Sequence, residues 1–182
     1  MKRSTLKQAF IRSFPVCIGY SFIGFGFGVL LRDAGYGFLW AMAMSVFIYA
    51  GSMQYVGVSL ITAPASLLTT ALTTFMINAR HIFYSVSMIG KYKDTGLYKP
   101  YLIFALTDET YALLSEEQEN TSASFYFFVS FFNHLYWILG TAVGSIFAGI
   151  RSCLFCPARS ATCYFCILFK RLLKLHKSLP IF

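Results

Sequence analysis

Two short groups of charged residues lie inside otherwise apolar sequence, and both could carry chemistry. The first is Asn78-Ala79-Arg80-His81, and the second is Thr107-Asp108-Glu109-Thr110. An arginine within a membrane-length segment costs roughly 2.5 to 3.5 kcal/mol on insertion scales, and it is retained mostly where it pairs with an acid, a substrate or a water-filled path. We therefore predict a functional role for Arg80. A structural ion pair or a snorkelling position near the interface is the alternative.

The segment around Arg80 predicts a helix with one polar and one apolar half. At 100° per residue, the polar side chains of residues 69–89 gather on one half of the helix. They are Thr69, Thr70, Thr73, Thr74, Asn78, Arg80, His81, Tyr84, Ser85 and Ser87. Such a pattern in a membrane-length segment indicates that the polar half faces protein or water. For the hydroxyl groups alone, interhelical hydrogen bonding is a sufficient explanation.

The acidic pair Asp108 and Glu109 has a structural interpretation as well as a functional one. Thr107 can cap a helix whose first turn holds both carboxylates, where the helix dipole favours negative charge. Neighbouring side chains on a helix point about 100° apart, so one carboxylate at most faces the helix of Arg80. We predict that this carboxylate belongs to Asp108. His81 is a candidate proton relay or a hydrogen-bonded packing residue.

Composition predicts the elements that position these groups. The chain is 57% apolar and 12% charged, its mean hydropathy is +0.63, and residues 34–79 contain no charged side chain. These values exclude an ordinary water-soluble domain. The basic residues concentrate near the two ends of the chain, so no extended basic surface is left for binding nucleic acid. We expect an all-α, polytopic membrane bundle over residues 1–150. The predicted spans are 14–31, 37–61, 66–89 and 124–150, with a weaker re-entrant or interfacial segment at 101–114.

Charged loops predict the orientation of these spans. The basic residues before residue 13 indicate a cytoplasmic N-terminus with an uncleaved first span, and the loop 91–99 and the chain from Arg151 are cytoplasmic candidates. The acidic loop 116–119 is an external candidate. Three full crossings before Lys91 would conflict with this scheme, so either a segment between residues 36 and 90 enters and returns on one side, or the loop breaks the rule. The Gly, Ser and Gln side chains of residues 49–54 favour a broken or re-entrant segment there.

Small residues and cysteines mark two further features. Gly24 with Gly28, and Gly140 with Gly144, have the spacing that lets two helices approach closely, in a monomer or a homo-oligomer. The tail 151–182 carries Cys153, Cys156, Cys163 and Cys166, but its central gap is too short for the usual zinc arrangement. We predict no metal site and interpret this basic tail as an aberrant end.

Three ordered motifs carry a family resemblance over residues 5–150. They are Gly51-Ser52-Met53-Gln54-Tyr55, then Asn78-Ala79-Arg80-His81-Ile82-Phe83-Tyr84, then Leu106-Thr107-Asp108-Glu109-Thr110-Tyr111. Together they resemble the AzlC family of bacterial branched-chain amino-acid exporters. Membership would imply a secondary exporter of valine, leucine or isoleucine in the inner membrane, with a small AzlD-like membrane protein as its partner. Family members are usually longer, with further apolar spans where this chain has its cysteine-rich tail.

A zwitterionic, aliphatic cargo matches the chemistry of these motifs. Arg80 could bind the carboxylate through its planar fork, and Asp108 could bind the ammonium or carry a coupling proton. The expected substrate site also includes Gln54, Ser52, Asn78 and Tyr84, and Glu109 and His81 are further proton-coupling candidates.

Two other classes of protein remain open. One is a membrane assembly subunit without its own pathway. The other is an integral-membrane enzyme that uses His81, Asp108 or His134, but no nucleophile and base at a known spacing support it. A nucleotide-binding loop, a metalloprotease motif and a nucleophile elbow are also absent from the sequence. We therefore expect no enzymatic activity and no cofactor.

Overall fold

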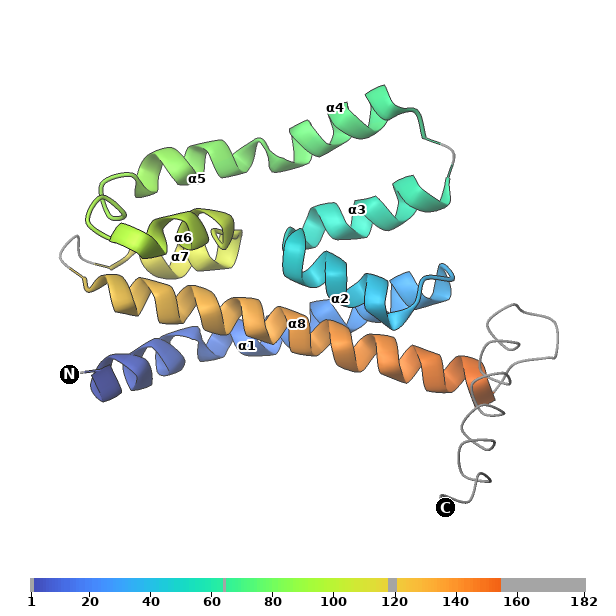
Figure 1. Ribbon diagram of the computed structural model, residues 1–182, viewed down its shortest axis with the longest axis horizontal. Helices are drawn as coiled ribbons and strands as arrows, with labels where there is room; N and C mark the ends of the chain where they lie inside the picture. The colour runs from blue at the N-terminus through green and yellow to red at the C-terminus, as the bar shows by residue number, and fades with distance from the viewer. Residues whose placement is uncertain (1, 64, 118–120, 155–182) are drawn as a thin grey trace, which may run out of the picture.

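The computed structural model describes residues 2–63, 65–117 and 121–154, and the regular secondary structure in this part of the chain is entirely helical (Figure 1). This confirms the predicted all-α class. The cysteine-rich tail falls mainly on residues 155–182, outside the described residues, so the interpretation of that tail remains a prediction.

Two long helices form the base of the fold. Helix α1 (Lys2–Asp33) and helix α8 (Ala123–Leu154) lie side by side and run in the same direction (Figure 1). Within them, Thr5–Asp33 and Ala123–Arg151 are long and apolar enough to cross a membrane. A Cβ atom on Gly24 would lie 3.0 Å from the Trp137 carbonyl oxygen, and one on Gly140 would lie 2.9 Å from the carbonyl oxygens of Tyr20 and Ser21. The two glycine motifs therefore pack α1 against α8 within one chain.

A first helical hairpin follows α1. Helix α2 (Phe38–Phe47) and helix α3 (Gly51–Thr62) run in opposite senses, and the chain turns back between them (Figure 1). Tyr49 lies at this turn with a φ of 41°, a left-handed conformation that is uncommon for a residue with a side chain. Its buried ring stacks on His134 of α8 at 4.2 Å, and the His134 Nε2 atom donates to the Ser45 carbonyl at 3.2 Å. The expected broken segment is thus present, and packing against α8 supports it.

The polar segment of residues 66–89 forms two helices rather than one. Helix α4 (Leu67–Asn78) begins at the cap Ser66, and helix α5 (Arg80–Met88) continues in nearly the same direction after a break at Ala79 (Figure 1). The His81 Nδ1 atom donates to the Asn78 carbonyl at 3.2 Å, so a side chain competes for backbone hydrogen bonding at this point. The prediction of one continuous helix is therefore wrong at Ala79.

The apolar half of this segment does lie outward. Its large side chains are exposed in the isolated chain, as expected for a surface that faces lipid or neighbouring helices. They include Leu72, Phe75, Met76, Ile82, Phe83, Val86 and Ile89.

A second hairpin precedes α8. After the short 3-10 helix η1 (Gly96–Tyr98), helix α6 (Lys99–Phe104) leads into the bundle and helix α7 (Asp108–Ser115) returns from it (Figure 1). The Thr107 hydroxyl caps α7 by accepting from the Thr110 backbone N–H, and Asp108 and Glu109 occupy the first turn. The predicted cap and the position of both carboxylates are confirmed.

The second hairpin corrects the predicted orientation of the loops. The Lys91 Nζ atom donates to the carbonyls of Leu114, Ser115 and Glu117 at 2.9, 2.7 and 2.6 Å, and Arg12 pairs with Glu116 at 2.6 Å. The basic loop 91–99 and the acidic residues 116–117 therefore share one end of the bundle, because the chain between them enters and returns. Placing these loops on opposite sides is wrong.

The ion pairs at the two ends of the bundle also test the predicted orientation of the chain. Arg151 pairs with Asp33 at 2.6 Å, at the end opposite Arg12. The start of α1 and Arg151 consequently cannot both be cytoplasmic if the bundle spans a membrane, which corrects the prediction that they are.

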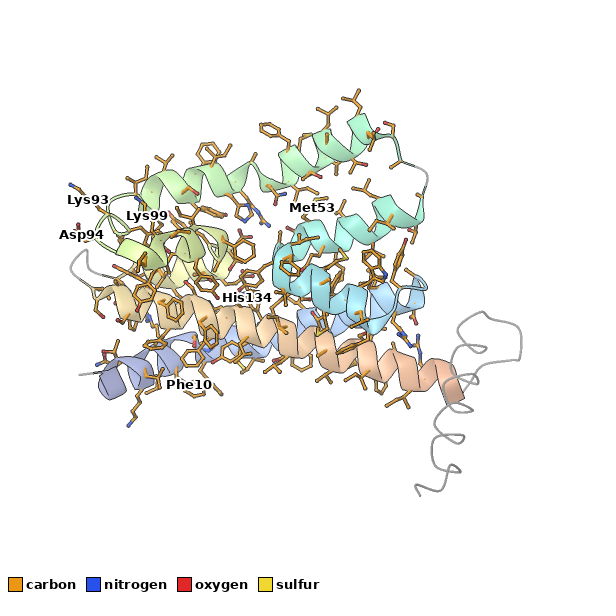
Figure 2. The ribbon with its side chains drawn as sticks, in the orientation of Figure 1. Phe10, Met53, Lys93, Asp94, Lys99 and His134 are labelled. Atoms are coloured by element: carbon orange, nitrogen blue, oxygen red, sulfur yellow. The ribbon has the colours of Figure 1, made fainter. Side chains whose placement is uncertain are left out.

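Lys91 provides a test of the second hairpin. Its ammonium satisfies carbonyls at the C-terminal end of α7, where intrahelical partners are missing. We expect Lys91→Met to lower the free energy of unfolding by about 1 to 2 kcal/mol, because charge-assisted hydrogen bonds are lost at a partly exposed site. Lys93→Met is the matched control, because Lys93 is exposed on the same loop (Figure 2). Thermal unfolding in detergent measures both; equal melting temperatures would contradict the capping role.

Candidate functional site

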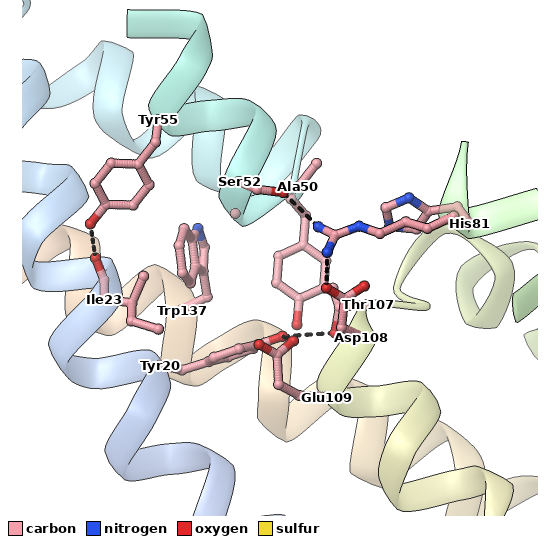
Figure 3. Close-up of a pocket in the computed structure, with 13 residues that line it drawn as sticks. Tyr20, Ile23, Ala50, Ser52, Tyr55, His81, Thr107, Asp108, Glu109 and Trp137 are labelled. Carbon is pink, nitrogen blue, oxygen red and sulfur yellow. Dashed lines mark hydrogen bonds and ion pairs between the residues drawn. The ribbon is translucent and has the colours of Figure 1, made fainter. Parts of the chain in front are cut away.

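A pocket of about 270 Å³, lined by both charged and apolar side chains, lies where the starts of three helices meet. Residues 50–52 at the start of α3, 80–81 at the start of α5 and 107–109 at the start of α7 contribute to its lining. The other lining residues are Tyr20 and Ile23 of α1, Tyr49, Tyr55 of α3 and Trp137 of α8 (Figure 3). The two hairpins and the break at Ala79 therefore converge on one site.

Arg80 joins the two hairpins across this pocket. Its Nη2 atom donates to the Ser52 hydroxyl at 2.5 Å, and its Nη1 atom forms an ion pair with the Asp108 Oδ2 atom (Figure 3). The side chains of Arg80 and Asp108 keep 40% and 34% of their surface exposed. The pairing of Arg80 with Asp108 agrees with the helical spacing, and it leaves part of the guanidinium open to the pocket.

Glu109 points to a different wall, as its position one residue after Asp108 requires. The Tyr20 hydroxyl donates to the Glu109 Oε2 atom at 2.7 Å and lies 2.7 Å from the Thr107 hydroxyl (Figure 3). Tyr20 is 4% exposed and packs edge-on against Trp137 at 5.5 Å. A buried tyrosine of α1 thus holds a carboxylate of α7.

Two of the helix starts offer uncapped backbone donors. Among the described residues, no side chain caps the first turns of α3 and α5. The first N–H groups of a helix lack intrahelical partners and carry a partial positive charge, so such a terminus favours an anion. The start of α5 adjoins the C-terminal end of α4, whose dipole opposes it. The start of α3, beside the Arg80 guanidinium, therefore makes this part of the pocket suitable for a carboxylate.

The structure brings some of the predicted site residues together and leaves others apart. Arg80, Asp108, Ser52, His81 and Glu109 all line the pocket. The remaining three candidates, Gln54, Asn78 and Tyr84, do not line it.

Each of these three has other surroundings. Gln54 is 1% exposed, and neither amide atom of its side chain has a hydrogen-bond partner among the described residues. Asn78 offers its backbone carbonyl to His81. Tyr84 stacks on Tyr111 at 4.5 Å, and its hydroxyl lies close enough to Asp108 and Arg80 to interact electrostatically with both. The predicted roles of Gln54 and Asn78 in substrate binding gain no support from this geometry, and the role of Tyr84 stays a prediction.

Four aromatic residues of the pocket were not among the predicted site residues. Tyr20, Tyr49, Tyr55 and Trp137 belong to apolar segments in which an aromatic side chain is unremarkable. For Tyr49 and Tyr55 a signal existed, because Tyr49 directly precedes the Ala50-Gly51-Ser52 break and Tyr55 ends the motif that begins at Gly51. For Tyr20 and Trp137 we find no signal in the sequence.

No metal centre is visible in the described part of the chain, where groups of three His, Cys, Asp or Glu side chains that could hold an ion do not occur. The side chains of Cys153, Cys156, Cys163 and Cys166 lie outside that part.

Fold and pocket together define an all-α membrane protein with a polar site inside its helical bundle. The family described as AzlC protein matches residues 15–150, and the chain belongs to this family. Its relatives include the branched-chain amino acid transport protein AzlC of Bacillus subtilis, 37% identical over 155 residues, which cover 80% of this chain and 60% of that protein. An uncharacterized membrane protein of Helicobacter pylori is 41% identical over 143 residues, with 77% and 63% covered.

A more distant relative is the inner membrane protein YgaZ of Escherichia coli, 29% identical over 143 residues, with 73% of this chain and 57% of that protein covered. No solved structure matches the chain. The chain spans about three fifths of the length of the curated relatives that it matches.

Proposed function

We propose that this chain is a subunit of a gradient-driven transporter that exports branched-chain amino acids such as valine. The observation that carries the proposal is the Arg80 guanidinium, which bridges Ser52 and Asp108 inside a pocket at the meeting point of three helix starts. The name of the Bacillus subtilis relative, a branched-chain amino acid transport protein, supports the same class of substrate.

The carboxylate of the amino acid would bind at Arg80. A guanidinium can hold a carboxylate by two parallel hydrogen bonds, and the uncapped start of α3 adds favourable backbone donors. The substrate must then compete with Asp108 for Arg80. The Asp108 carboxylate, once released, is the place where a coupling proton would bind, with Glu109 and His81 as the other candidates in the pocket.

The size and walls of the pocket suit a small aliphatic cargo. Its volume of about 270 Å³ is just below the range of about 300 to 1,000 Å³ typical of sites for drug-sized ligands. Ile23, Tyr55 and Trp137 supply apolar surface beside the charged groups. A branched side chain would contact these residues while both charged ends meet polar groups.

We propose that the transmembrane domain of residues 1–150 lies in the bacterial inner membrane with its N-terminus in the cytoplasm. Arg12 and Lys91 both contact residues 114–117 at one end of the bundle, and Lys93 and Lys99 lie at the same end (Figure 2). Basic residues concentrate on the cytoplasmic side of membrane proteins. The hairpins α2–α3 and α6–α7 would enter from opposite sides. Discontinuous helices that meet near the midplane are a recurrent way in which transporters build a substrate site.

The exposed apolar side chains of α4 and α5 favour a second interpretation, in which the chain serves assembly alone. An AzlD-like subunit, a second copy of this chain or lipid could cover that surface. A transport measurement separates the two functions, because an assembly subunit changes no flux through groups in its own pocket.

Efflux from cells loaded with a valine-containing dipeptide tests the proposed function. We expect valine to leave cells that express the full chain with an AzlD-like partner several-fold faster than cells that express the partner alone. Lysine release from cells loaded with a lysine-containing dipeptide serves as the control, because a cationic side chain does not suit the apolar walls. Equal valine efflux with and without the chain would contradict the proposal.

A further inference from the structure

The pocket carries more acidic than basic charge among its described residues. Arg80 is paired with Asp108, but Glu109 has no Lys, Arg or His partner in the described part of the chain. An ionised carboxylate in a partly desolvated site is costly unless a positive charge accompanies it. The pocket therefore has one carboxylate available for a cation from outside the chain.

The surroundings of Glu109 position this carboxylate without neutralising it. Tyr20 donates one hydrogen bond to the Oε2 atom, whereas an ionised carboxylate has about four acceptor sites on its two oxygens. Because Tyr20 is buried and in contact with Trp137 and Thr107, its hydroxyl fixes the direction of the carboxylate. Acceptor sites remain for an ammonium group.

We propose that Glu109, positioned by Tyr20, is the acceptor for the ammonium group of the amino acid. This inference rests on the proposed function, and it separates the roles of the two neighbouring carboxylates. Asp108 faces Arg80 and Ser52 on one wall, and Glu109 faces Tyr20 on another (Figure 3). A zwitterion would thus place its carboxylate at Arg80 and its ammonium at Glu109.

Three small probe molecules distinguish binding of the ammonium group from binding of the carboxylate. Valine carries both charges, isobutylamine lacks the carboxylate, and 3-methylbutanoate lacks the ammonium. We would measure their binding to the full chain purified together with its AzlD-like partner in lipid nanodiscs. We expect Glu109→Gln to weaken valine and isobutylamine by about tenfold or more, since a charge-assisted hydrogen bond is lost. The binding of 3-methylbutanoate should not weaken, because this probe has no ammonium group and the variant removes a like charge from the pocket.

Two further variants keep the test independent of folding. Tyr20→Phe retains the carboxylate but removes the hydroxyl that positions it, and it should weaken the two amines by about threefold without affecting 3-methylbutanoate. Asp94→Asn is the matched control, because it removes an exposed carboxylate far from the pocket and should change no binding (Figure 2). If Glu109→Gln does not fold, the effect of Tyr20→Phe on the binding of valine and isobutylamine tests the ammonium role of Glu109 instead.

The outcomes distinguish this inference from the proposed function. Equal weakening of all three probes by Glu109→Gln, or no weakening of any, would overturn the ammonium role. Valine binding that depends on Arg80 but not on Glu109 would keep the proposed function and reject this inference. If wild type binds isobutylamine through Glu109 but binds no valine, the acceptor role stands and the proposed cargo fails. Binding of none of the probes would overturn both.

Discussion

Arg80→Ala is expected to reduce valine export by about a hundredfold, close to the level of cells without the chain. The guanidinium would supply two charge-assisted hydrogen bonds to the substrate carboxylate, and a loss of about 3 kcal/mol corresponds to roughly two powers of ten. The same change leaves Asp108 without its ion-pair partner. Initial rates of valine efflux, normalised to the amount of protein in the membrane, measure the effect.

The charge left on Asp108 must be separated from the loss of the binding group. The double variant Arg80→Ala with Asp108→Asn removes both partners, so it should recover the membrane level and the melting temperature but not export. Arg151→Ala is the matched control, because Arg151 forms an ion pair with Asp33 at the end of the bundle, where an exposed pair contributes about 0 to 1 kcal/mol. Wild-type efflux from Arg80→Ala would remove the basis of the substrate site.

The features that sequence predicted well depend on short-range periodicity. Thr107 precedes two carboxylates at the start of α7, as capping chemistry requires, and the angle between successive side chains directs Asp108 rather than Glu109 toward Arg80. The glycine spacing in α1 and α8 likewise indicated a close helix contact, although it did not show that each motif packs against the other.

The features that sequence missed depend on contacts between distant parts of the chain. Ala79 favours a helix by its own propensity, yet the helix breaks there, beside Arg80, which reaches Ser52 and Asp108. Tyr20 binds a carboxylate 89 positions away, and nothing in its own segment indicates this partner. The side on which the acidic residues 116–117 lie follows from the hairpin α6–α7, which charge counting alone did not establish.

The contact between α1 and α8 predicts the largest effect on stability. A Cβ atom on Gly144 would overlap the backbone of Phe25, with the Phe25 carbonyl carbon and Cα atom at 2.8 Å. Backbone atoms of a helix cannot rotate away, so the two helices would have to separate. We expect Gly144→Ala to lower the free energy of unfolding by about 3 kcal/mol, the upper end of the usual cost of overpacking.

Gly149 and Gly19 offer matched controls because they lie in the same two helices. A Cβ atom on Gly149 would meet only the flexible Arg32 side chain, at 3.3 Å, and one on Gly19 would have no neighbour within 4 Å. Replacing either by alanine should stabilise the protein by up to about 1 kcal/mol through helix propensity alone. Unfolding in mixed detergent, followed by tryptophan fluorescence, compares the three variants. If Gly144→Ala proves as stable as Gly149→Ala, the close approach of α1 and α8 is wrong, and so is the wall that Tyr20 and Trp137 form in the pocket.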